Sequence, residues 1–180
     1  MSLKQQTIEH ILSLEGGYVN DTSDSGGETN FGITQRVAKA NGYAGPMRDM
    51  QRSVAFNIYA SRYWDALSLD QIESLCPTVA QEMADTGVNM GIGRAAEFLQ
   101  RSLNAFNNQG QYYPDIKVDM DIGPATLRAL NAFIDRRDSE GENVLLSALN
   151  ALQGSFYIDL TERRQKDEKY LYGWFLNRVA

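Results

Sequence analysis

One stretch of this 180-residue chain breaks an otherwise helical pattern, and that break decides the class of fold. Residues 3–15 place their apolar side chains on one helical face, and Gly16-Gly17 is predicted to end the helix because glycine tolerates a left-handed cap. Residues 18–33 are rich in Asn, Asp, Ser, Thr and Gly, a composition typical of turns and short strands. The sequence therefore predicts a mainly α (α+β) fold with a small β-hairpin lobe near residues 18–33.

Helices are expected in the rest of the chain wherever apolar residues recur at helical spacing between glycine or proline stops. The expected ranges are 34–40, 49–64, 77–87, 94–105, 124–134, 142–164 and 169–179. Pro77 and Pro124 suit the first turns of their helices, because a first-turn residue has no helical hydrogen bond to lose. Residues 136–141 are expected to form a charged connector between two helices.

Reactive side chains other than carboxylates are scarce, and this narrows the possible chemistry. The chain has one His, His10, and one Cys, Cys76, against 23 Asp and Glu residues. A disulfide within the chain is impossible, and a conventional zinc site is not expected. A Ser-His-Asp or Cys-His arrangement would have to use His10, which we expect to be a structural or surface residue, while Cys76 is expected in the core. We therefore expect carboxylates to carry any catalysis, with no metal or organic cofactor.

The charge and hydropathy patterns exclude two further classes of partner. The formal net charge is −6 and the sequence pI is about 4.8, whereas nucleic-acid binders usually carry a basic stripe. The longest apolar runs span a few residues, so no transmembrane helix is expected. The N-terminus lacks the apolar stretch of a secretory signal, which predicts a cytoplasmic protein as synthesised.

Glu15 is the carboxylate that the helical pattern singles out. Its spacing puts it on the same apolar face as Ile8, Ile11 and Leu12. Burial disfavours charge, so the pKa of such a carboxyl is expected to rise, which keeps a general acid protonated near neutral pH. A polar hairpin near the helix end could supply the second group that glycoside hydrolysis needs. The alternatives are a solvated Glu15 and an ordinary set of turns.

Two neighbouring motifs carry a resemblance to a known family. They are Glu15-Gly16-Gly17-Tyr18-Val19-Asn20-Asp21 and Gly26-Gly27-Glu28-Thr29-Asn30-Phe31-Gly32-Ile33-Thr34. Joined in this order, and supported by residues 59–65 and 85–96, they resemble the signature of glycoside hydrolase family 108. Residues 118–127 and 173–179 resemble the small peptidoglycan-binding module that accompanies this family. The resemblance implies a catalytic region at 1–92 and a peptidoglycan-binding-like helical region at 93–180, packed on the first.

The family comprises N-acetylmuramidases of phage and prophage endolysins, and bacterial proteins once labelled secretion activators. The resemblance implies a lysozyme-like helical fold, with Glu15 as the catalytic general acid. It implies hydrolysis of the β-1,4 bond between N-acetylmuramic acid and N-acetylglucosamine in peptidoglycan glycan strands. Separately from the resemblance, we expect a monomer that acts on the cell wall after release to the periplasm. The alternatives are a lytic transglycosylase on a similar fold and a non-enzymatic, peptidoglycan-binding or secretion-associated protein.

The second catalytic group has three candidate assignments. Related phage lysozymes place an Asp nine residues after the catalytic Glu and a Thr a little further on. Here Asp24 lies nine residues after Glu15 and Thr29 lies fourteen after it, which favours Asp24 as the water-orienting base with Thr29 in support. Asp21 is the rival because it lies in the tighter motif, and Glu15 acting without a second carboxylate is the third possibility.

Five residues are candidates for contacts with the sugars. They are Tyr18, Asp21, Asn30, Tyr63 and Asn89. Tyr63 lies four residues after Tyr59, so the two rings share a helical face that could stack on a sugar, although such aromatic faces more often belong to a core. Asn89 could bond an N-acetyl group or cap the following helix. Arg94 could meet substrate carboxylates, and a salt bridge with Asp85 is the alternative we favour.

Overall fold

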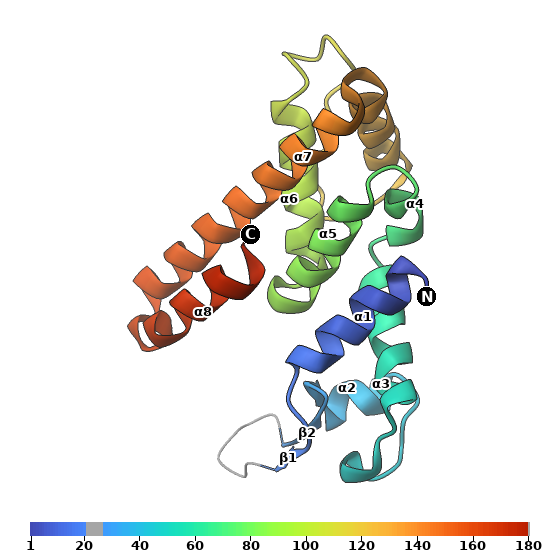
Figure 1. Ribbon diagram of the computed structural model, residues 1–180, viewed down its shortest axis with the longest axis vertical. Helices are drawn as coiled ribbons and strands as arrows, with labels where there is room; N and C mark the ends of the chain where they lie inside the picture. The colour runs from blue at the N-terminus through green and yellow to red at the C-terminus, as the bar shows by residue number, and fades with distance from the viewer. Residues whose placement is uncertain (21–26, 180) are drawn as a thin grey trace. The chain divides into compact units, whose positions relative to one another are not determined.

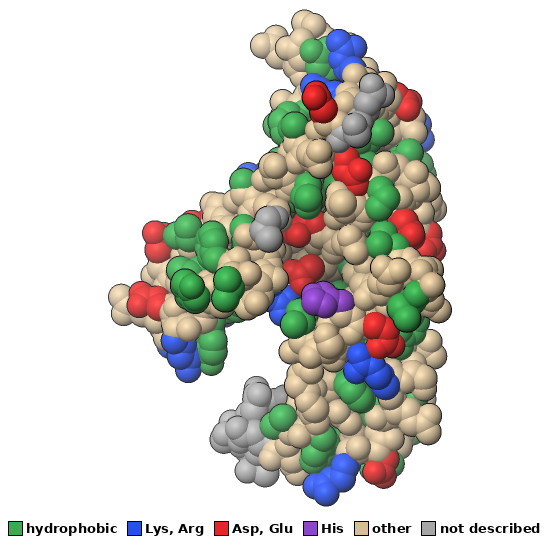
Figure 2. Space-filling model, in the orientation of Figure 1, with side chains coloured by type: hydrophobic (Ala, Val, Ile, Leu, Met, Phe, Trp, Pro, Cys, Tyr) green, Lys and Arg blue, Asp and Glu red, His purple; other side chains and the backbone are tan. Residues whose placement is uncertain are grey.

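The structure, a computed structural model, describes residues 1–20 and 27–179. Within them the fold is mainly α with one small antiparallel sheet, as the sequence predicts (Figure 1). The chain divides into two compact units, Met1–Ala66 and Leu67–Ala180, which are described in turn. Acidic and basic side chains are interspersed over the face shown in Figure 2. Across the described part of the chain, no helix combines the length and the apolar character needed to cross a bilayer.

The N-terminal unit is built from short helices around the sheet. Its elements are α1 (Leu3–Leu14), β1 (Val19–Asn20), β2 (Glu28–Asn30), β3 (Ile33–Thr34), α2 (Gln35–Ala40), the 3-10 turn η1 (Met47–Asp49), α3 (Arg52–Tyr59) and the π-helical turn η2 (Ala60–Asp65). Ser2 begins α1 with a capping box, because its hydroxyl accepts from the Gln5 N–H and the Gln5 amide oxygen accepts from the Ser2 N–H. Thr34 caps α2 by accepting from the Val37 N–H. These caps fix where both helices begin.

The core of this unit lies where α1 packs on α3 and η2. The apolar stripe of α1 is buried there, as its spacing predicts, and Trp64 of η2 is fully buried as well. Tyr59 is also a core residue, with 4% of its surface exposed, which agrees with the core interpretation of this aromatic face. His10 is exposed at the surface.

The end of α1 differs from the prediction in its cap. Glu15 takes extended backbone (φ −76°, ψ 142°) while its N–H still donates to the Ile11 carbonyl at 3.1 Å. Neither Gly16 nor Gly17 has a positive φ, so the predicted left-handed cap is wrong. The chain passes directly from the last helical turn into the extended run that leads to β1, and a left-handed residue there would redirect it.

The sheet holds its central strand, β2, between two antiparallel neighbours in the order β1-β2-β3. Asn30 pairs with Ile33 across a two-residue turn formed by Phe31 and Gly32. Both turn residues have positive φ, 51° and 70°, which is the pattern of a type I′ hairpin. The buried Asn30 side chain anchors the turn by donating to the Met47 carbonyl at 2.8 Å. The position of the turn is therefore fixed from outside the hairpin as well as from within it.

The C-terminal unit is entirely helical in its regular elements. They are α4 (Leu69–Glu73), α5 (Pro77–Met90), α6 (Ile92–Ala105), α7 (Pro124–Arg163), the 3-10 turn η3 (Gln165–Asp167) and α8 (Glu168–Arg178). Pro77 and Pro124 each stand at the first turn of their helix, as predicted. The Cys76 thiol is buried, as predicted, and burial raises its pKa to about 12.

The prediction of two helices separated by a charged connector at 136–141 is wrong. One 40-residue helix, α7, runs through that stretch. Arg and Glu, which supply three of the residues in that stretch, are good helix formers, so the density of charge did not signal a break. Gly141 is buried, and a Cβ at that position would lie 3.3 Å from the Phe133 ring. In a straight helix eight residues span about 12 Å, so α7 bends here with Gly141 on the inner side. Figure 1 shows this as a change of direction between the brown and orange parts of α7.

The turn before α7 is held by one buried amide, Gln100 of α6. Its Nε2 donates to the Asp119 carboxylate and to the Asp121 carbonyl, both at 2.8 Å. Its oxygen accepts from the backbone N–H groups of Asp119 and Met120. Bonding by Gln100 and by the Asp121 N–H holds the pKa of the Asp119 carboxyl below its ordinary value. Within residues 118–127, these hydrogen bonds therefore fix the conformation of the turn at 119–121.

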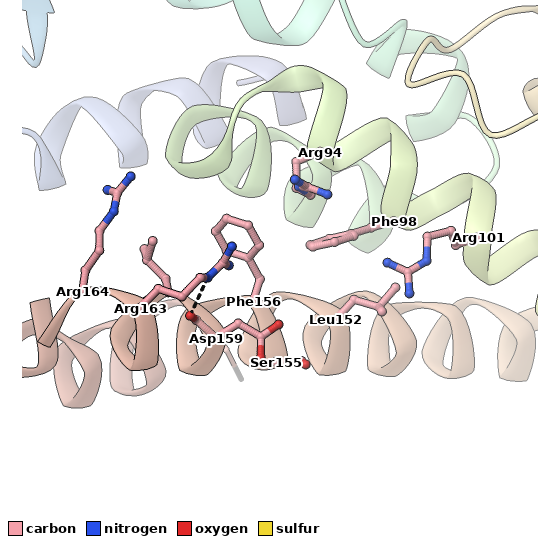
Figure 3. A pocket seen from close by; sticks show the side chains of 10 residues that line it. Arg94, Phe98, Arg101, Leu152, Ser155, Phe156, Asp159, Arg163 and Arg164 are labelled. Carbon is pink, nitrogen blue, oxygen red and sulfur yellow. Dashed lines mark hydrogen bonds between the residues drawn. The ribbon is translucent and has the colours of Figure 1, made fainter.

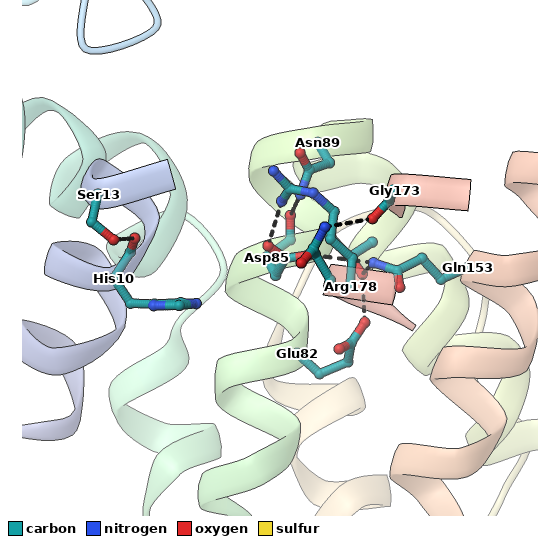
Figure 4. A network of polar contacts seen from close by, with 10 residues as sticks. His10, Ser13, Glu82, Asp85, Asn89, Gln153, Gly173 and Arg178 are labelled. Carbon is teal, nitrogen blue, oxygen red and sulfur yellow. Dashed lines mark hydrogen bonds and ion pairs between the residues drawn. The ribbon is translucent and has the colours of Figure 1, made fainter. Parts of the chain in front are cut away.

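A buried polar network joins α5 to α7 and α8 (Figure 4). Arg178 of α8 pairs with the Asp85 carboxylate at 2.7 Å. Gln153 of α7 donates to the Thr86 hydroxyl at 3.1 Å, and that hydroxyl donates to the Glu82 carboxylate at 2.9 Å. Burial raises the pKa of the Asp85 carboxyl, although Arg178 opposes this effect. Asp85 therefore pairs with α8, and the predicted salt bridge with Arg94 is wrong.

Glu82 makes the stability of the protein depend on pH. Burial, aided by the charge of Asp85, raises the pKa of Glu82 from 4.5 to about 7. Between these values the folded state keeps a proton that the unfolded state has lost, so the free energy of unfolding falls as pH rises from 4.5 to about 7. We expect Glu82→Gln to remove the part of this decline that Glu82 causes. The variant should therefore be more stable than the unsubstituted protein at pH 8, and the gain should be smaller at pH 5. Urea unfolding at pH 5, 6, 7 and 8 measures it, with the exposed Glu162→Gln as control; equal slopes for both variants would contradict the assignment.

Candidate active site

Glu15 lies where the last turn of α1 meets the hairpin. Its side chain is half-buried, which agrees in part with its predicted place on the apolar face. A Cβ built on Gly32 would lie 2.5 Å from Glu15 Oε2 and 3.1 Å from its Cδ. The carboxylate therefore packs directly against the backbone of the hairpin turn. A side chain at position 32 would collide with it and would also be strained by the positive φ.

Tyr59 of α3 supports this contact from the other side. Its hydroxyl donates to the Phe31 carbonyl at 3.0 Å, and the same oxygen would lie 3.0 Å from a Cβ added at Gly32. Burial, followed by the charge of Glu15, raises the pKa of Tyr59 above its ordinary value. The phenol is therefore neutral, and its one proton is committed to the turn. Tyr63 packs against it with ring centroids 5.4 Å apart.

The strands bring a second carboxylate to this lobe. The Tyr18 hydroxyl donates to Glu28 Oε1 at 2.9 Å, and the Arg48 guanidinium carbon lies 4.9 Å from the centre of the Tyr18 ring. Thr29 lies on the central strand, opposite Val19 on one side and Thr34 on the other, and is half-buried. The tyrosine, the carboxylate and the arginine form one connected set beside the hairpin.

The other candidate residues have different surroundings. Asp21 and Asp24 lie outside the described residues, so their assignments stay predictions. Asn30 is 5% exposed and its amide nitrogen bonds Met47, as described above. Asn89 belongs to the C-terminal unit, where it is exposed and donates to the Asp85 carbonyl at 2.8 Å. The idea that Asn89 caps the next helix is wrong, because Gly91 is the N-cap of α6.

Sequence reasoning missed the roles of Gly32 and Tyr59 beside Glu15. Gly32 had a local signal, since a two-residue turn between strands needs positive φ and glycine supplies it. Tyr59 had none, because its contact with the turn crosses 28 positions of sequence. Within the described residues, 1–20 and 27–179, no group of three or more His, Cys, Asp or Glu side chains is placed to hold a metal ion. The Glu15 carboxyl group beside the Tyr59 hydroxyl and the hairpin turn can take part in proton transfer.

Comparison with known protein families gives two matches. Residues 8–91 match the family described as Glycosyl hydrolase 108, and residues 94–179 match the one described as Predicted Peptidoglycan domain. The compact units divide earlier, between Ala66 and Leu67, so α4 and α5 lie in the first match yet pack within the second unit. No curated protein matches the chain.

A solved structure shares the fold. It is titled "Structure of Brucella abortus SagA" and matches with a TM-score of 0.68, over 98% of this chain and 88% of that chain, at 23% identity. Together the two family matches cover almost the whole sequence, and the first contains Glu15 and the entire hairpin. Residues 8–91 thus form a glycosyl hydrolase 108 domain and residues 94–179 a peptidoglycan domain, which makes the chain a glycoside hydrolase with peptidoglycan as its partner.

Proposed function

We propose that the chain is an N-acetylmuramidase, which hydrolyses the β-1,4 bond between N-acetylmuramic acid and N-acetylglucosamine, with Glu15 as general acid. The observation that carries the proposal is the contact between the half-buried Glu15 carboxyl group and the Gly32 turn, inside the segment matched to the hydrolase family. A carboxyl group held at the junction of a helix end and a β lobe can present its proton to a glycosidic oxygen.

The reaction follows from this position. Glu15 donates its proton to the leaving glycosidic oxygen as the bond from that oxygen to the anomeric carbon breaks. A water molecule attacks the anomeric carbon and gives its own proton to a base. Tyr59 does not compete for these protons, because its hydroxyl is bonded to the Phe31 carbonyl. Its part is to keep the turn, and with it the carboxyl group, in place.

The setting we propose is degradation of the cell wall by an endolysin of prophage type. Peptidoglycan lies outside the cytoplasmic membrane, so the protein reaches its substrate only after release to the periplasm. The motif resemblance at Glu15 to Asp21 supports this setting.

Replacing Glu15 by Gln tests the general acid. We expect Glu15→Gln to lower turnover of purified sacculi by about 10²- to 10⁴-fold, because an amide cannot donate the proton, with thermal stability retained. Turbidity loss and released reducing ends measure the rate. Glu9→Gln, an exposed carboxylate on the same helix that pairs with Arg52, is the matched control and should keep its activity. A fully active Glu15→Gln variant would refute the proposal. Products with 1,6-anhydro ends in the mass spectrum would show that the enzyme is a lytic transglycosylase and not a hydrolase.

Gly32→Ala tests the contact that positions Glu15. The added methyl group would collide with the carboxylate. We therefore expect activity to fall by more than the fraction of protein that is unfolded under the assay conditions. Gly27→Ala is the matched control, since Gly27 has a similar φ of 67° but nothing within 4 Å of the Cβ position. Both variants therefore carry the backbone strain and only Gly32→Ala disturbs Glu15. Equal activities at equal stability would show that the contact has no catalytic role.

Two Asp-to-Asn substitutions test which residue is the second catalytic group. We expect Asp24→Asn to reduce hydrolysis strongly and Asp21→Asn to retain most of it, because the spacing from Glu15 favours Asp24 as the water-orienting base. Thr29→Val should produce a smaller loss. Kinetics on purified sacculi measure all three. A larger loss of hydrolysis in Asp21→Asn than in Asp24→Asn would assign the role to Asp21. Full activity in both variants would leave Glu15 as the sole catalytic carboxyl group.

A further inference from the structure

The C-terminal unit contains a cationic groove between α6 and α7, with a volume of about 630 Å³ (Figure 3). We call it the arginine groove. Four of the chain's 17 basic residues line it: Arg94, Arg101, Arg163 and Arg164. Figure 3 shows the first two side chains coming from α6 and the last two from the end of α7. All of its lining residues lie within the segment that matches the peptidoglycan domain.

The charge of the groove contrasts with its surroundings. Residues 67–180 carry 11 basic and 16 acidic side chains, so this unit is acidic as a whole. The groove reverses that balance, because its four guanidinium groups face two carboxylates, Asp159 in the lining and Glu97 beside Arg94 and Arg101. A cleft lined by one sign of charge concentrates ligands of the opposite sign. The arrangement therefore selects an anion.

Contacts within the protein orient Arg94, Arg101 and Arg163 and leave some of their donors unused. Glu97 pairs with Arg94 and, at 3.5 Å, with Arg101. The Arg163 Nε donates to the Asp159 carbonyl at 2.9 Å. Each guanidinium has five N–H donors in a fixed plane, so one or two internal bonds aim the group without exhausting it. A forked pair of such donors matches the two oxygens of a carboxylate.

The base of the groove is apolar. Phe98 is 3% exposed, and Phe156 lies beneath the Arg94 guanidinium, whose central carbon is 5.2 Å from the ring centre. Leu152 and Leu160 also contribute to the lining. A ligand for this groove therefore combines carboxylates with small apolar groups. Short acidic peptides with alanine side chains have this chemistry.

We propose that the arginine groove binds the peptide stems of peptidoglycan through their free carboxylates. The inference rests on the proposed function for its partner, peptidoglycan, but assigns a different part of that polymer to a different unit of the protein. The glycan strand is the substrate of the N-terminal site, whereas the stems are the ligand of the groove. The groove also supplies local attraction where an acidic protein meets a polymer that itself carries carboxylates.

The test compares two pairs of charge substitutions in full-length Glu15→Gln protein, so that the wall stays intact. Arg101→Gln/Arg164→Gln removes two exposed cations from the groove. Lys117→Gln/Arg128→Gln removes two exposed cations from another cavity of the same unit and is the matched control. Binding is measured by co-sedimentation with purified sacculi and with sacculi stripped of their peptides by an amidase. Circular dichroism checks that each variant is folded.

We expect the groove pair to bind intact sacculi at least tenfold more weakly than the control pair, and both to bind stripped glycan equally. Soluble muropeptides should displace the protein, and inorganic phosphate at equal ionic strength should not. Equal binding of both pairs to intact sacculi overturns the proposal, and displacement by phosphate makes the groove a phosphate site. Hydrolysis of sacculi is measured in a separate experiment, with protein that keeps Glu15. Its absence would refute the muramidase while leaving the groove result standing.

Discussion

The contact between the Glu15 carboxyl group and the backbone at Gly32 is the constraint on which the N-terminal unit is arranged. It requires that α1 end at Leu14, that the chain continue in extended backbone, and that the hairpin turn adopt positive φ at both positions. It also requires the turn to be held from outside, by Asn30 on Met47 and by Tyr59 on Phe31. A π-helical turn follows Tyr59 directly, and such turns occur often at functional sites.

The C-terminal unit depends on a different kind of contact, since its helices are joined by buried polar groups as well as by an apolar core. Removing one partner of such a network leaves the other buried and unsatisfied, so each bond constrains the helix that supplies it. Arg178 and Gln153 tie α8 and α7 to α5, and Gln100 ties the turn before α7 to α6. Two of these contacts join residues more than 60 positions apart, Arg178 with Asp85 and Gln153 with Thr86.

Local features of the sequence predict most of the fold, and contacts distant in sequence account for what they miss. Helix starts at Pro77, Pro124 and Thr34 follow from capping chemistry, and the place of the sheet follows from composition. Glu15 can be singled out from the sequence because its helical spacing places a carboxylate on the apolar face of residues 3–15. The stretch 136–141 resembles a loop because it is charged and ends in Gly141, yet it stays helical, and Gly141 lies on the inner side of a bend close to Phe133. The partner of Asp85 has no local signal, since Arg178 lies 93 positions away.

In the two proposals above, the two units present different electrostatics to different parts of one polymer. A general acid benefits from burial of its carboxyl group, and the turn backbone that packs on the half-buried Glu15 adds no charge of its own. Recognition of carboxylates needs the opposite, a solvated set of cations held in fixed directions. Placing four arginines beside Glu15 would favour its ionised form and weaken it as an acid. Separate units allow both requirements to be met, which is a physical reason for a hydrolase of this size to carry a second helical domain.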